Sequence, residues 1–542
     1  MIAKVYSAIP QGYHGHLIEV EAATSNSLPA FNIVGMANKT ISEARERVRL
    51  ALTNSGFTFP NRKITINLAP AELTKDGSHL DLPIALSILA TSRQLSPDNL
   101  KHRLFIGELS LDGQTKAVRG IINAVETAKN AGFKEIILPR ANLPSSSLIS
   151  DIKLIGVDNL TQAFLYLKGE FSPPTYTKNT VSSPQSKPNV VQNTYTDNYN
   201  SKSNVVKNTQ TDKFPTLDEI SGHSFAKRAL AIAIAGHHNL LLHGPPGSGK
   251  TLLAKTAAGL QPPPLLAEQI EITKLHSLTH PSESVISQRP FRTPHHSAST
   301  TSIIGGGVNA LPGEISLAHR GILFLDELPE FKRDVLEALR QPLEDKTITI
   351  SRANQHLTYP ANFTLIAALN PCPCGYYGDP QHSCTCTASQ IQKYHQRISG
   401  PILDRFDLTV CVQSIEPAAL LSTHQSAVVK NTKTDIDHGQ LAHEQNVVKN
   451  NITDAIHQQR LRYRNNPSFF NADLSAPQIS QYLHVSSAAT HLLNQATQKF
   501  SLSSRAYLKV IKVAQTIADL NSTPKILPEH ISEALSFRQH FT

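Results

Sequence analysis

The feature that most constrains the fold of this chain is a glycine-rich loop between a short apolar strand and a helix. Residues 239–243 read NLLLH, residues 244–251 read GPPGSGKT, and a run of helical composition follows over residues 252–258. In the pattern G-x-x-x-x-G-K-[ST], the glycines let backbone N–H groups turn inward around phosphates, and the helix N-terminus adds positive potential. This setting predicts an α/β domain that binds a nucleoside triphosphate.

The loop itself supplies the residues that are expected to contact the nucleotide. Lys250 should reach the outer phosphates, and the Thr251 hydroxyl should ligate Mg²⁺. The expected ligands are therefore ATP and Mg²⁺. The predicted binding residues are Gly244, Pro245, Pro246, Gly247, Ser248, Gly249, Lys250 and Thr251.

A second element further along the chain supplies the chemistry of hydrolysis. Residues 321–327 read GILFLDE, an apolar run that ends in two carboxylates. Asp326 is placed to hold Mg²⁺, while Glu327 can orient and deprotonate the attacking water. An apolar run of this kind is weak evidence alone, but downstream of a P-loop it is strong evidence for a hydrolysis site.

Two further polar residues are candidates for contacts with the γ-phosphate. Residues 364–369 form a third strand, and it ends in Asn370, which can contact the γ-phosphate or its water. Arg405 lies in the sequence LDRFD at residues 403–407. A guanidinium stabilises charge on the transferring phosphoryl group, and one supplied by a neighbouring subunit makes hydrolysis depend on assembly. Without the other motifs, a surface ion pair is the better interpretation of Arg405.

The chain divides into three folded segments and two polar ones. We expect an α/β or α+β domain over residues 1–168, a linker over 169–213, a denser α/β domain over 214–421, a low-complexity insertion over 422–451 and a helical domain over 452–542. The polar segments are rich in Ser, Thr, Asn and Lys and cannot bury a core. In the first domain, strands are expected at 64–68, 104–106 and 136–138, and helices at 42–53, 80–91 and 121–131. An amphipathic helix is expected around residues 507–518.

Composition favours a soluble, cytoplasmic protein. No apolar leader follows Met1, and no stretch approaches the roughly 18 uninterrupted apolar residues of a spanning helix. The net charge of +9 permits binding to a polyanion. Because a basic balance is common, charge alone does not establish such binding.

Four of the five cysteines cluster in one short segment. Cys372-x-Cys374 and Cys384-x-Cys386 lie in a Gly- and Pro-rich stretch with His382 nearby. Four thiolates in such a loop could complete a tetrahedral Zn²⁺ site. Free thiols and a redox role remain alternatives, since paired C-x-C is less diagnostic than paired C-x-x-C. Cys411 follows a strand-like run and is expected to be a buried core residue.

Longer motifs accompany the P-loop at residues 35–49, 289–299 (RPFRTPHHSAS), 305–331, 339–353, 370–379 and 398–408. Together they resemble the AAA+ ATPases of the magnesium-chelatase clade, and the fit is close to the ComM family of competence-associated proteins. The resemblance implies a homo-hexameric ring with a helical lid and a central pore. It also implies a helicase-like motor that drives branch migration while transforming DNA is integrated, with single-stranded or branched DNA and recombination proteins as partners.

The resemblance also implies roles for individual residues. Arg405 resembles the arginine finger that completes a neighbour's site, and Arg505 resembles the second sensor arginine. Residues 347–353 resemble a hairpin that faces the pore, so Arg352 and Lys346 are expected to contact DNA phosphates. The alternative for these two residues is that they are exposed charges on a hairpin.

The first domain resembles Lon-type protease domains through residues 75–86 and 105–139. A Lon peptidase needs a nucleophilic serine and a lysine base. His79 aligns where the serine belongs and Ile122 where the lysine belongs. An alignment slip would let Ser78 replace the nucleophile but would leave the base missing. The sequence therefore predicts a non-catalytic relative of these domains, with binding of DNA or of a partner as its expected use.

Three rival functions stay open beside the DNA motor. A magnesium-chelatase motor subunit would act on a partner protein, but such subunits are not expected to carry both a Lon-like domain and a four-cysteine loop. An ATP-dependent peptidase is disfavoured by the missing lysine. A DNA-binding scaffold without activity is disfavoured by the intact hydrolysis motifs.

Overall fold

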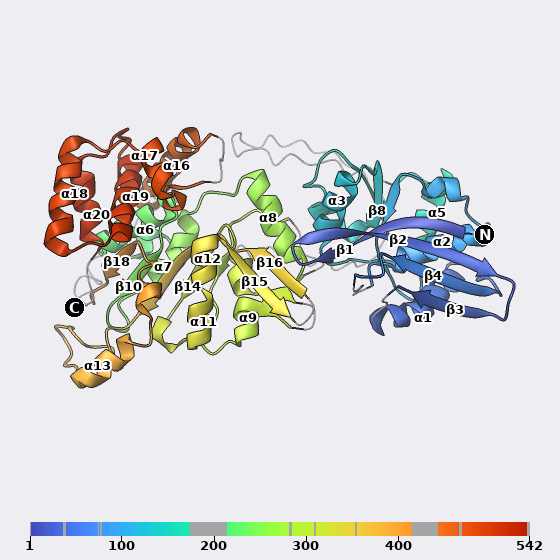
Figure 1. The fold of residues 1–542 in the computed structure, drawn as a ribbon, viewed down its shortest axis with the longest axis horizontal. Coiled ribbons are helices and arrows are strands. Elements are labelled where there is room, and N and C mark those ends of the chain that lie inside the picture. Colours follow the sequence, from blue (N-terminus) through green and yellow to red (C-terminus); the bar gives the residue numbers. More distant parts are fainter. Residues whose placement is uncertain are drawn as a thin grey trace, which may run out of the picture.

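The structure is a computed structural model in which three domains follow one another along the molecule (Figure 1). The expected linker and the expected insertion lie mostly outside the residues that the structure describes. Those residues are 2–35, 39–73, 75, 78–173, 214–280, 285–307, 310–352, 355–414, 443–464 and 469–538.

The N-terminal domain is built on a seven-stranded mixed sheet in the order β3-β4-β2-β1-β5-β8-β9. The predicted strands and helices are confirmed. In β4, for example, Ile64, Ile66 and Leu68 are buried and alternate with less buried residues, as the two-residue period of a strand requires. The strands of the large sheet are β1 (Ile2–Gln11), β2 (His14–Ser25), β3 (Ala30–Val34), β4 (Lys63–Ala69), β5 (Arg103–Phe105), β8 (Glu135–Pro139) and β9 (Lys153–Val157). Two short strands, β6 (Glu108–Leu109) and β7 (Thr115–Lys116), pair with each other. The helices are α1 (Lys39–Asn54), α2 (Asp81–Thr91), α3 (Ile121–Asn130), α4 (Leu143–Ser146) and α5 (Leu160–Lys168).

The central domain has a five-stranded parallel sheet in the order β11-β14-β17-β10-β18. The two inner strands at residues 322–325 and 364–369 are buried along their whole length, as expected where helices cover both faces of a parallel sheet. The strands are β10 (Leu240–His243), β11 (Phe291–Arg292), β14 (Ile322–Leu325), β17 (Thr364–Leu369) and β18 (Leu408–Cys411), with the small pairs β12 (Gly305–Gly306) and β13 (Leu311–Pro312), and β15 (Thr347–Arg352) and β16 (Gln355–Pro360). The helices are α6 (Ser224–Gly236), α7 (Lys250–Leu260), α8 (Leu266–Ser277), α9 (Thr300–Ile304), α10 (Glu314–Leu317), α11 (Arg333–Ala338), α12 (Arg340–Asp345), α13 (Ala388–His395) and α14 (Gly400–Leu403).

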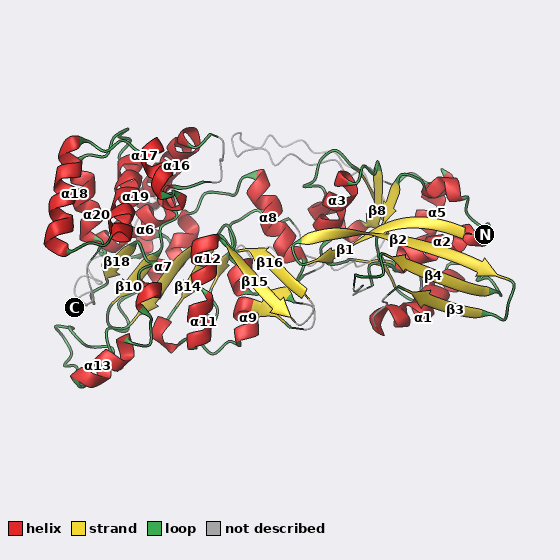
Figure 2. Cartoon of the chain, in the orientation of Figure 1, coloured by secondary structure: helices red, strands yellow, loops and turns green. Residues whose placement is uncertain are grey.

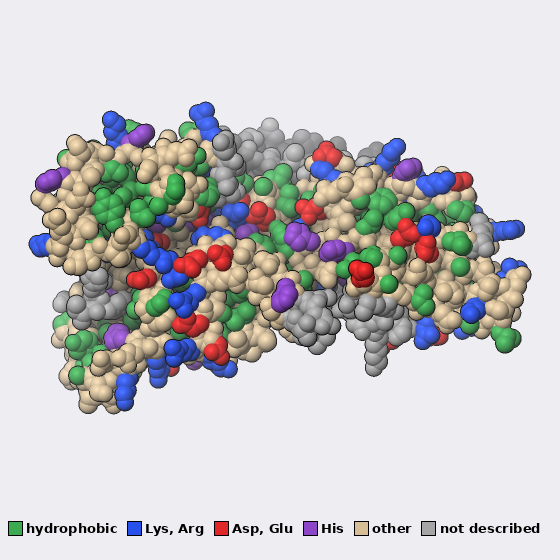
Figure 3. Space-filling view, in the orientation of Figure 1, with side chains coloured by type: hydrophobic (Ala, Val, Ile, Leu, Met, Phe, Trp, Pro, Cys, Tyr) green, Lys and Arg blue, Asp and Glu red, His purple; other side chains and the backbone are tan. Residues whose placement is uncertain are grey.

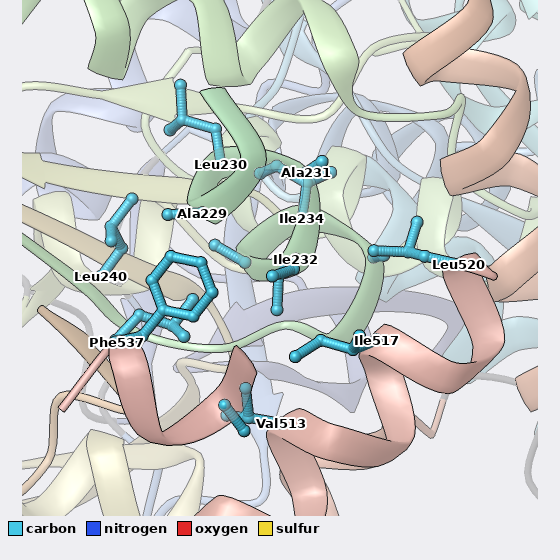
Figure 4. Close-up of a cluster of buried hydrophobic side chains, with 14 of the residues drawn as sticks. Ala229, Leu230, Ala231, Ile232, Ile234, Leu240, Val513, Ile517, Leu520 and Phe537 are labelled. Carbon is cyan, nitrogen blue, oxygen red and sulfur yellow. The ribbon is translucent and has the colours of Figure 1, made fainter. Parts of the chain in front are cut away.

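The C-terminal domain is helical, as predicted, and Figure 2 shows its helices grouped at one end of the molecule. Its helices are α16 (His443–Arg462), α17 (Ala476–Tyr482), α18 (Ser487–Phe500), α19 (Ser504–Leu520) and α20 (Pro528–Ser536). These helices share one hydrophobic core with α6 and β10 of the central domain, as Figure 4 shows for Ile232, Leu240 and Ile517. No described helix is long and apolar enough to cross a membrane.

One predicted boundary is wrong. Residues 443–451 were assigned to the low-complexity insertion, but they form the first part of α16. The segment is polar in composition, yet Val448 packs against the shared core, and Ile452 and Ala455 are fully buried on the same helix. Spacings of three and four residues bring these side chains to one face of the helix, and average composition does not reveal such spacing.

The N-terminal domain is docked on the central domain through α8. The backbone N–H of Gly120 donates to the carbonyl of Ser277 over 2.8 Å. The Lys274 ammonium pairs with Glu126 and lies 4.1 Å from the centre of the Tyr13 ring. The turn between β1 and β2 also reaches Leu357 of the β15–β16 hairpin, at Gly12.

Histidines gather on the face of the molecule where these two domains meet (Figure 3). A cavity of about 470 Å³ opens there, and His14, His16 and His356 are among the residues that line it. The N-terminal domain therefore touches both α8 and the hairpin that was expected to face a pore.

Candidate nucleotide site

The P-loop connects β10 to α7, as predicted, and α7 begins at Lys250. Lys250 is buried, and its ammonium donates to the carbonyls of Gly244 and Pro245 over 2.8 and 2.7 Å. Burial lowers the pKa of Lys250 to about 8, against the opposing effect of Asp326 and Glu327. The ammonium thus bonds to the loop's own carbonyls, and the phosphates of a nucleotide would offer it stronger partners.

Thr251 and Asp326 come together across the sheet. The Thr251 hydroxyl donates to a carboxylate oxygen of Asp326 over 2.7 Å. Asp326 directly follows β14, and the carboxyl ends of parallel strands meet at one edge of a sheet. A hydroxyl and a carboxylate at this spacing beside a P-loop are the two protein ligands that Mg²⁺ takes in P-loop NTPases.

Glu327 follows Asp326 in a left-handed backbone conformation, with φ of +52°, and its side chain is 51% exposed. Its carboxylate lies 3.3 Å from Nδ1 of His296. Sequence reasoning did not assign His296 a role. His296 belongs to the motif RPFRTPHHSAS, which carried the family resemblance. A sequence motif does not indicate which distant residue a side chain contacts.

Asn370 follows β17 at the same edge of the sheet. The neighbouring carbonyl, that of Leu369, accepts a hydrogen bond from the Gly244 N–H over 3.3 Å. The first residue of the P-loop and the residue before Asn370 are therefore directly linked. Asn370 therefore lies beside the start of the P-loop, and its contact with a γ-phosphate stays a prediction.

Arg405 and Arg505 lie at the opposite edge of the sheet. The carbonyl of Arg405 accepts a hydrogen bond of 3.0 Å from the side chain of Asn239, which precedes β10, whereas the P-loop follows β10. The four residues of β10 span about 13 Å. Neither arginine is therefore next to the P-loop of its own chain.

The two arginines share a carboxylate, that of Glu344. Arg405 pairs with it, and Arg505 donates to it over 3.2 Å. Both guanidinium groups line a cavity of about 540 Å³ between the central and helical domains, where Figure 3 shows basic and acidic side chains together. The Nε of Arg405 is buried without a hydrogen-bond partner. Burial, together with the charge of Arg505, lowers the pKa of Arg405. Two guanidinium groups this close together repel each other, and binding of an anion between them would relieve that repulsion.

Lys346 does not lie where the pore interpretation requires. It stands at the base of the β15–β16 hairpin, lines the same cavity as Arg405, and its ammonium is 3.6 Å from a carboxylate oxygen of Asp473. The prediction that Lys346 lines a pore is corrected, because the residue precedes the hairpin and faces the helical domain. The side chain of Arg352 lies outside the described residues, so its role stays a prediction.

The four predicted cysteines do converge. The sulfurs of Cys372, Cys374, Cys384 and Cys386 all lie within 4.8 Å of one another. Cys372 Sγ is 3.3 Å from Cys374 Sγ and 3.7 Å from Cys384 Sγ. A tetrahedral zinc with Zn–S bonds of about 2.3 Å has sulfurs roughly 3.8 Å apart, so the donor set fits this ion.

The surroundings favour the thiolate form at one of the four cysteines, Cys374, whereas burial and hydrogen bonds with the neighbouring thiols raise the pKa of Cys384 and Cys386. Backbone N–H groups of Tyr376 and Thr385 donate to Cys374 and lower the pKa of its thiol to about 5. His382 is not a fifth donor, because its Nδ1 pairs with Asp379 over 3.1 Å and its side chain is mostly exposed. Cys411 was expected in the core but is exposed. The side chains of β18 alternate, and Leu408 and Val410 take the buried face.

The N-terminal domain lacks a described serine–lysine pair. Ser78 donates to the carboxylate of Glu108, and the Lys75 ammonium donates to the carbonyls of Gly35 and Pro70. His79 is buried and its Nε2 bonds to the carbonyl of Arg119 over 2.8 Å. Ile122 is fully buried in a hydrophobic cluster. Neither Ser78 nor His79 bonds to a lysine in these contacts, and both the likeness to Lon domains and the lack of catalysis stay predictions.

Comparison with known families covers all three domains. The family described as magnesium chelatase, subunit ChlI, matches residues 216–420. Subunit ChlI of Mg-chelatase matches residues 20–142, and the C-terminal region of ChlI matches residues 442–538. These matches are to AAA+ ATPases, in agreement with the geometry of the P-loop.

Full-length relatives decide the family. The competence protein ComM of Haemophilus influenzae is 39% identical over 541 residues, which is 99% of this chain and 97% of that protein. The chain belongs to the ComM family. YifB of Salmonella typhimurium is 38% identical over 99% of this chain and 97% of its own length. A shorter match, 36% identical over 88 residues, links 16% of the chain to 19% of the DNA repair protein RadA of Bacillus subtilis.

Proposed function

We propose that this ComM-family ATPase is a DNA motor that works as a homo-hexameric ring and drives branch migration while transforming DNA is integrated. The observation that carries the proposal is the separation of Arg405 and Arg505 from the P-loop of their own chain. Two buried or half-buried guanidinium groups beside one carboxylate, at the edge of the sheet away from the phosphates, suit contact with a neighbour's nucleotide. In a closed ring of identical subunits, every nucleotide site has an adjacent subunit that can contribute its arginines.

Within this proposal each site residue has one role. Lys250 neutralises the β- and γ-phosphates, and Thr251 with Asp326 holds Mg²⁺. Glu327 activates water and Asn370 orients it. Arg405 acts as the finger and Arg505 as the second sensor, both on the next subunit's ATP. An Mg²⁺ ion held by Thr251 and Asp326 would screen the charge of the ATP phosphates.

DNA is the proposed partner on three grounds. The relatives include a competence protein and, over a short stretch, a DNA repair protein. The net charge of +9 suits a polyanion. The β15–β16 hairpin projects from the central domain toward the N-terminal domain and suits a pore. Single-stranded or branched DNA, cooperation with recombination proteins and a cytoplasmic setting complete the proposal, together with structural Zn²⁺ in the cysteine cluster.

The rival functions have less support. The family descriptions name magnesium chelatase, which favours a motor subunit that remodels a partner protein. The ChlI family also matches residues 20–142 of the N-terminal domain, so that domain does not separate the two functions. Against the chelatase function, a competence protein, ComM, matches this chain over 99% of its length. A peptidase is disfavoured because Ile122 is buried and apolar where a lysine base would stand.

A branch-migration assay on a synthetic four-way junction tests the proposal. The purified chain with ATP and Mg²⁺ should convert the junction into duplex products, and Glu327→Gln protein should not. ATP hydrolysis that neither responds to DNA nor moves a junction would favour the chelatase-type motor, which reconstitution with a chelatase partner would then test.

A further inference from the structure

The four-cysteine loop lies against the nucleotide site. It leaves the carboxyl edge of the central sheet at Asn370, directly after β17, and it ends where α13 begins at Ala388, on the side of the molecule away from the N-terminal domain (Figure 1). Its first residues are held at two points. The Leu369 carbonyl accepts from the Gly244 N–H, and His395 of α13 bonds the Pro371 carbonyl over 3.0 Å.

The loop also touches the P-loop directly, at Gly375. This residue follows Cys374, has φ of +88°, and donates its N–H to the Cys372 carbonyl over 3.0 Å. A Cβ built on Gly375 would lie 2.6 Å from two ring carbons of Pro246, the third residue of the P-loop. Real Cβ contacts are not this short, so a glycine is needed for the two loops to approach. The proline ring is rigid and cannot move away as a flexible side chain could.

The cysteines determine whether this contact can persist. Cys372 and Cys374 come from the start of the loop, and Cys384 and Cys386 come from its end. A metal ion that joins the two pairs closes the loop and removes the conformational freedom of the residues between them. Gly375 lies within the closed part, so closure fixes the surface that Pro246 packs against.

We propose that the metal-filled cysteine cluster braces the P-loop, so that nucleotide binding and hydrolysis depend on whether Zn²⁺ occupies Cys372, Cys374, Cys384 and Cys386. Filling the cluster holds Gly375 against Pro246 and holds the backbone next to Asn370. Losing the metal releases both, and the P-loop samples conformations that bind phosphates less well. The inference rests on the proposed ATPase activity and is independent of DNA as the partner.

A matched pair of glycine variants tests the contact. Gly375→Ala places a methyl group against Pro246, whereas Gly378→Ala adds a methyl group in the same loop where nothing lies within 4 Å. Both glycines have positive φ, +88° and +79°, so the backbone strain of the two variants is similar. The measurements are zinc per chain by metal analysis, affinity for a fluorescent ATP analogue, and ATP turnover without DNA.

We expect about one zinc per chain in the unmodified protein and in both glycine variants. Gly375→Ala should bind the ATP analogue at least about tenfold more weakly, while Gly378→Ala should stay within about twofold of the unmodified protein. Cys384→Ser should lose zinc and affinity together. Melting curves report whether each variant is folded, and if Cys384→Ser does not fold, the two glycine variants decide.

Three results would overturn the proposal that the metal-filled cysteine cluster stabilises the P-loop. They are a zinc-free unmodified protein, normal analogue affinity in Gly375→Ala, and loss of zinc from folded Cys384→Ser without a change in affinity. Failure of the DNA motor is a separate outcome. If nucleotide affinity depends on zinc but the protein does not drive branch migration, the proposed role of zinc stands and the proposed DNA function is wrong.

Discussion

His296 Nδ1 lies 3.3 Å from Glu327 Oε2, so the carboxylate proposed to activate water has an imidazole as its neighbour. An imidazole this close can hold the carboxylate in one position, and a carboxylate so held is less free to turn toward the attacking water. We infer that His296 restrains Glu327 until nucleotide and DNA rearrange the site.

Replacing His296 with alanine should raise ATP turnover in the absence of DNA. Loss of this partly exposed contact predicts an increase of about two- to fivefold, with ATP affinity unchanged. Steady-state phosphate release with and without single-stranded DNA measures it. His295→Ala is the control, because His295 is adjacent but pairs with Ser297. A lower turnover in His296→Ala would mean that the ring orients Glu327 for catalysis instead.

Nucleotide binding and hydrolysis should be separable. Lys250→Ala removes the main phosphate cation and should abolish ATP binding. Glu327→Gln keeps the shape of the side chain but removes the base, so turnover should fall by about 10²- to 10⁴-fold while ATP still binds. Equilibrium binding and single-turnover hydrolysis distinguish the two effects. Parental turnover in Glu327→Gln would refute the role given to this residue.

Arg405 should act on the neighbouring subunit. Arg405→Ala and Lys250→Ala chains should each be inactive alone, and mixing them should restore part of the activity. Some interfaces of a mixed ring then join an intact P-loop to an intact arginine. Native mass spectrometry confirms mixing, and melting curves check that Arg405→Ala is folded, since Arg405 is largely buried. Mixed rings with no recovered turnover would contradict action in trans.

ATP binding should take up a proton above pH 8 but not at pH 7. Burial holds the pKa of Lys250 near 8, below its usual value of 10.5, and bound phosphates raise it again because they favour the charged ammonium. Below pH 8, Lys250 is protonated with and without ATP. Above pH 8, Lys250 loses its proton in the empty site, and ATP binding must restore that proton. The affinity for ATP therefore falls by up to about tenfold per pH unit. Calorimetry at pH 7 and 9, in two buffers of different ionisation enthalpy, counts the protons. Equal counts at both pH values would contradict this.

Much of the nucleotide site could be predicted from the sequence because its motifs are local. The P-loop, the acidic pair after β14 and Asn370 after β17 each follow directly from a strand. Parallel strands then bring their carboxyl ends together without further information. Thr251 and Asp326 meet for this reason, although they are far apart in the chain.

Contacts between distant segments could not be predicted in this way. His296 with Glu327, Gly375 with Pro246, and the arginines with Glu344 depend on how loops and domains pack. Two predictions were wrong for the same reason. Cys411 lies on the exposed face of its strand, and Lys346 faces the helical domain. Burial and direction are properties of the packed structure, which residue type does not determine.

The central claim is that ATP sites are shared between subunits of a ring that encloses DNA. ATP binds such an interface more tightly than a lone chain does, so it should favour assembly, and a polyanion in the pore should favour the same state. Sedimentation of the purified chain with a slowly hydrolysed ATP analogue and single-stranded DNA tests this most directly. The account predicts a monomer or weak oligomer without ligands and a hexamer with both. A chain that stays monomeric when saturated with both ligands would contradict it.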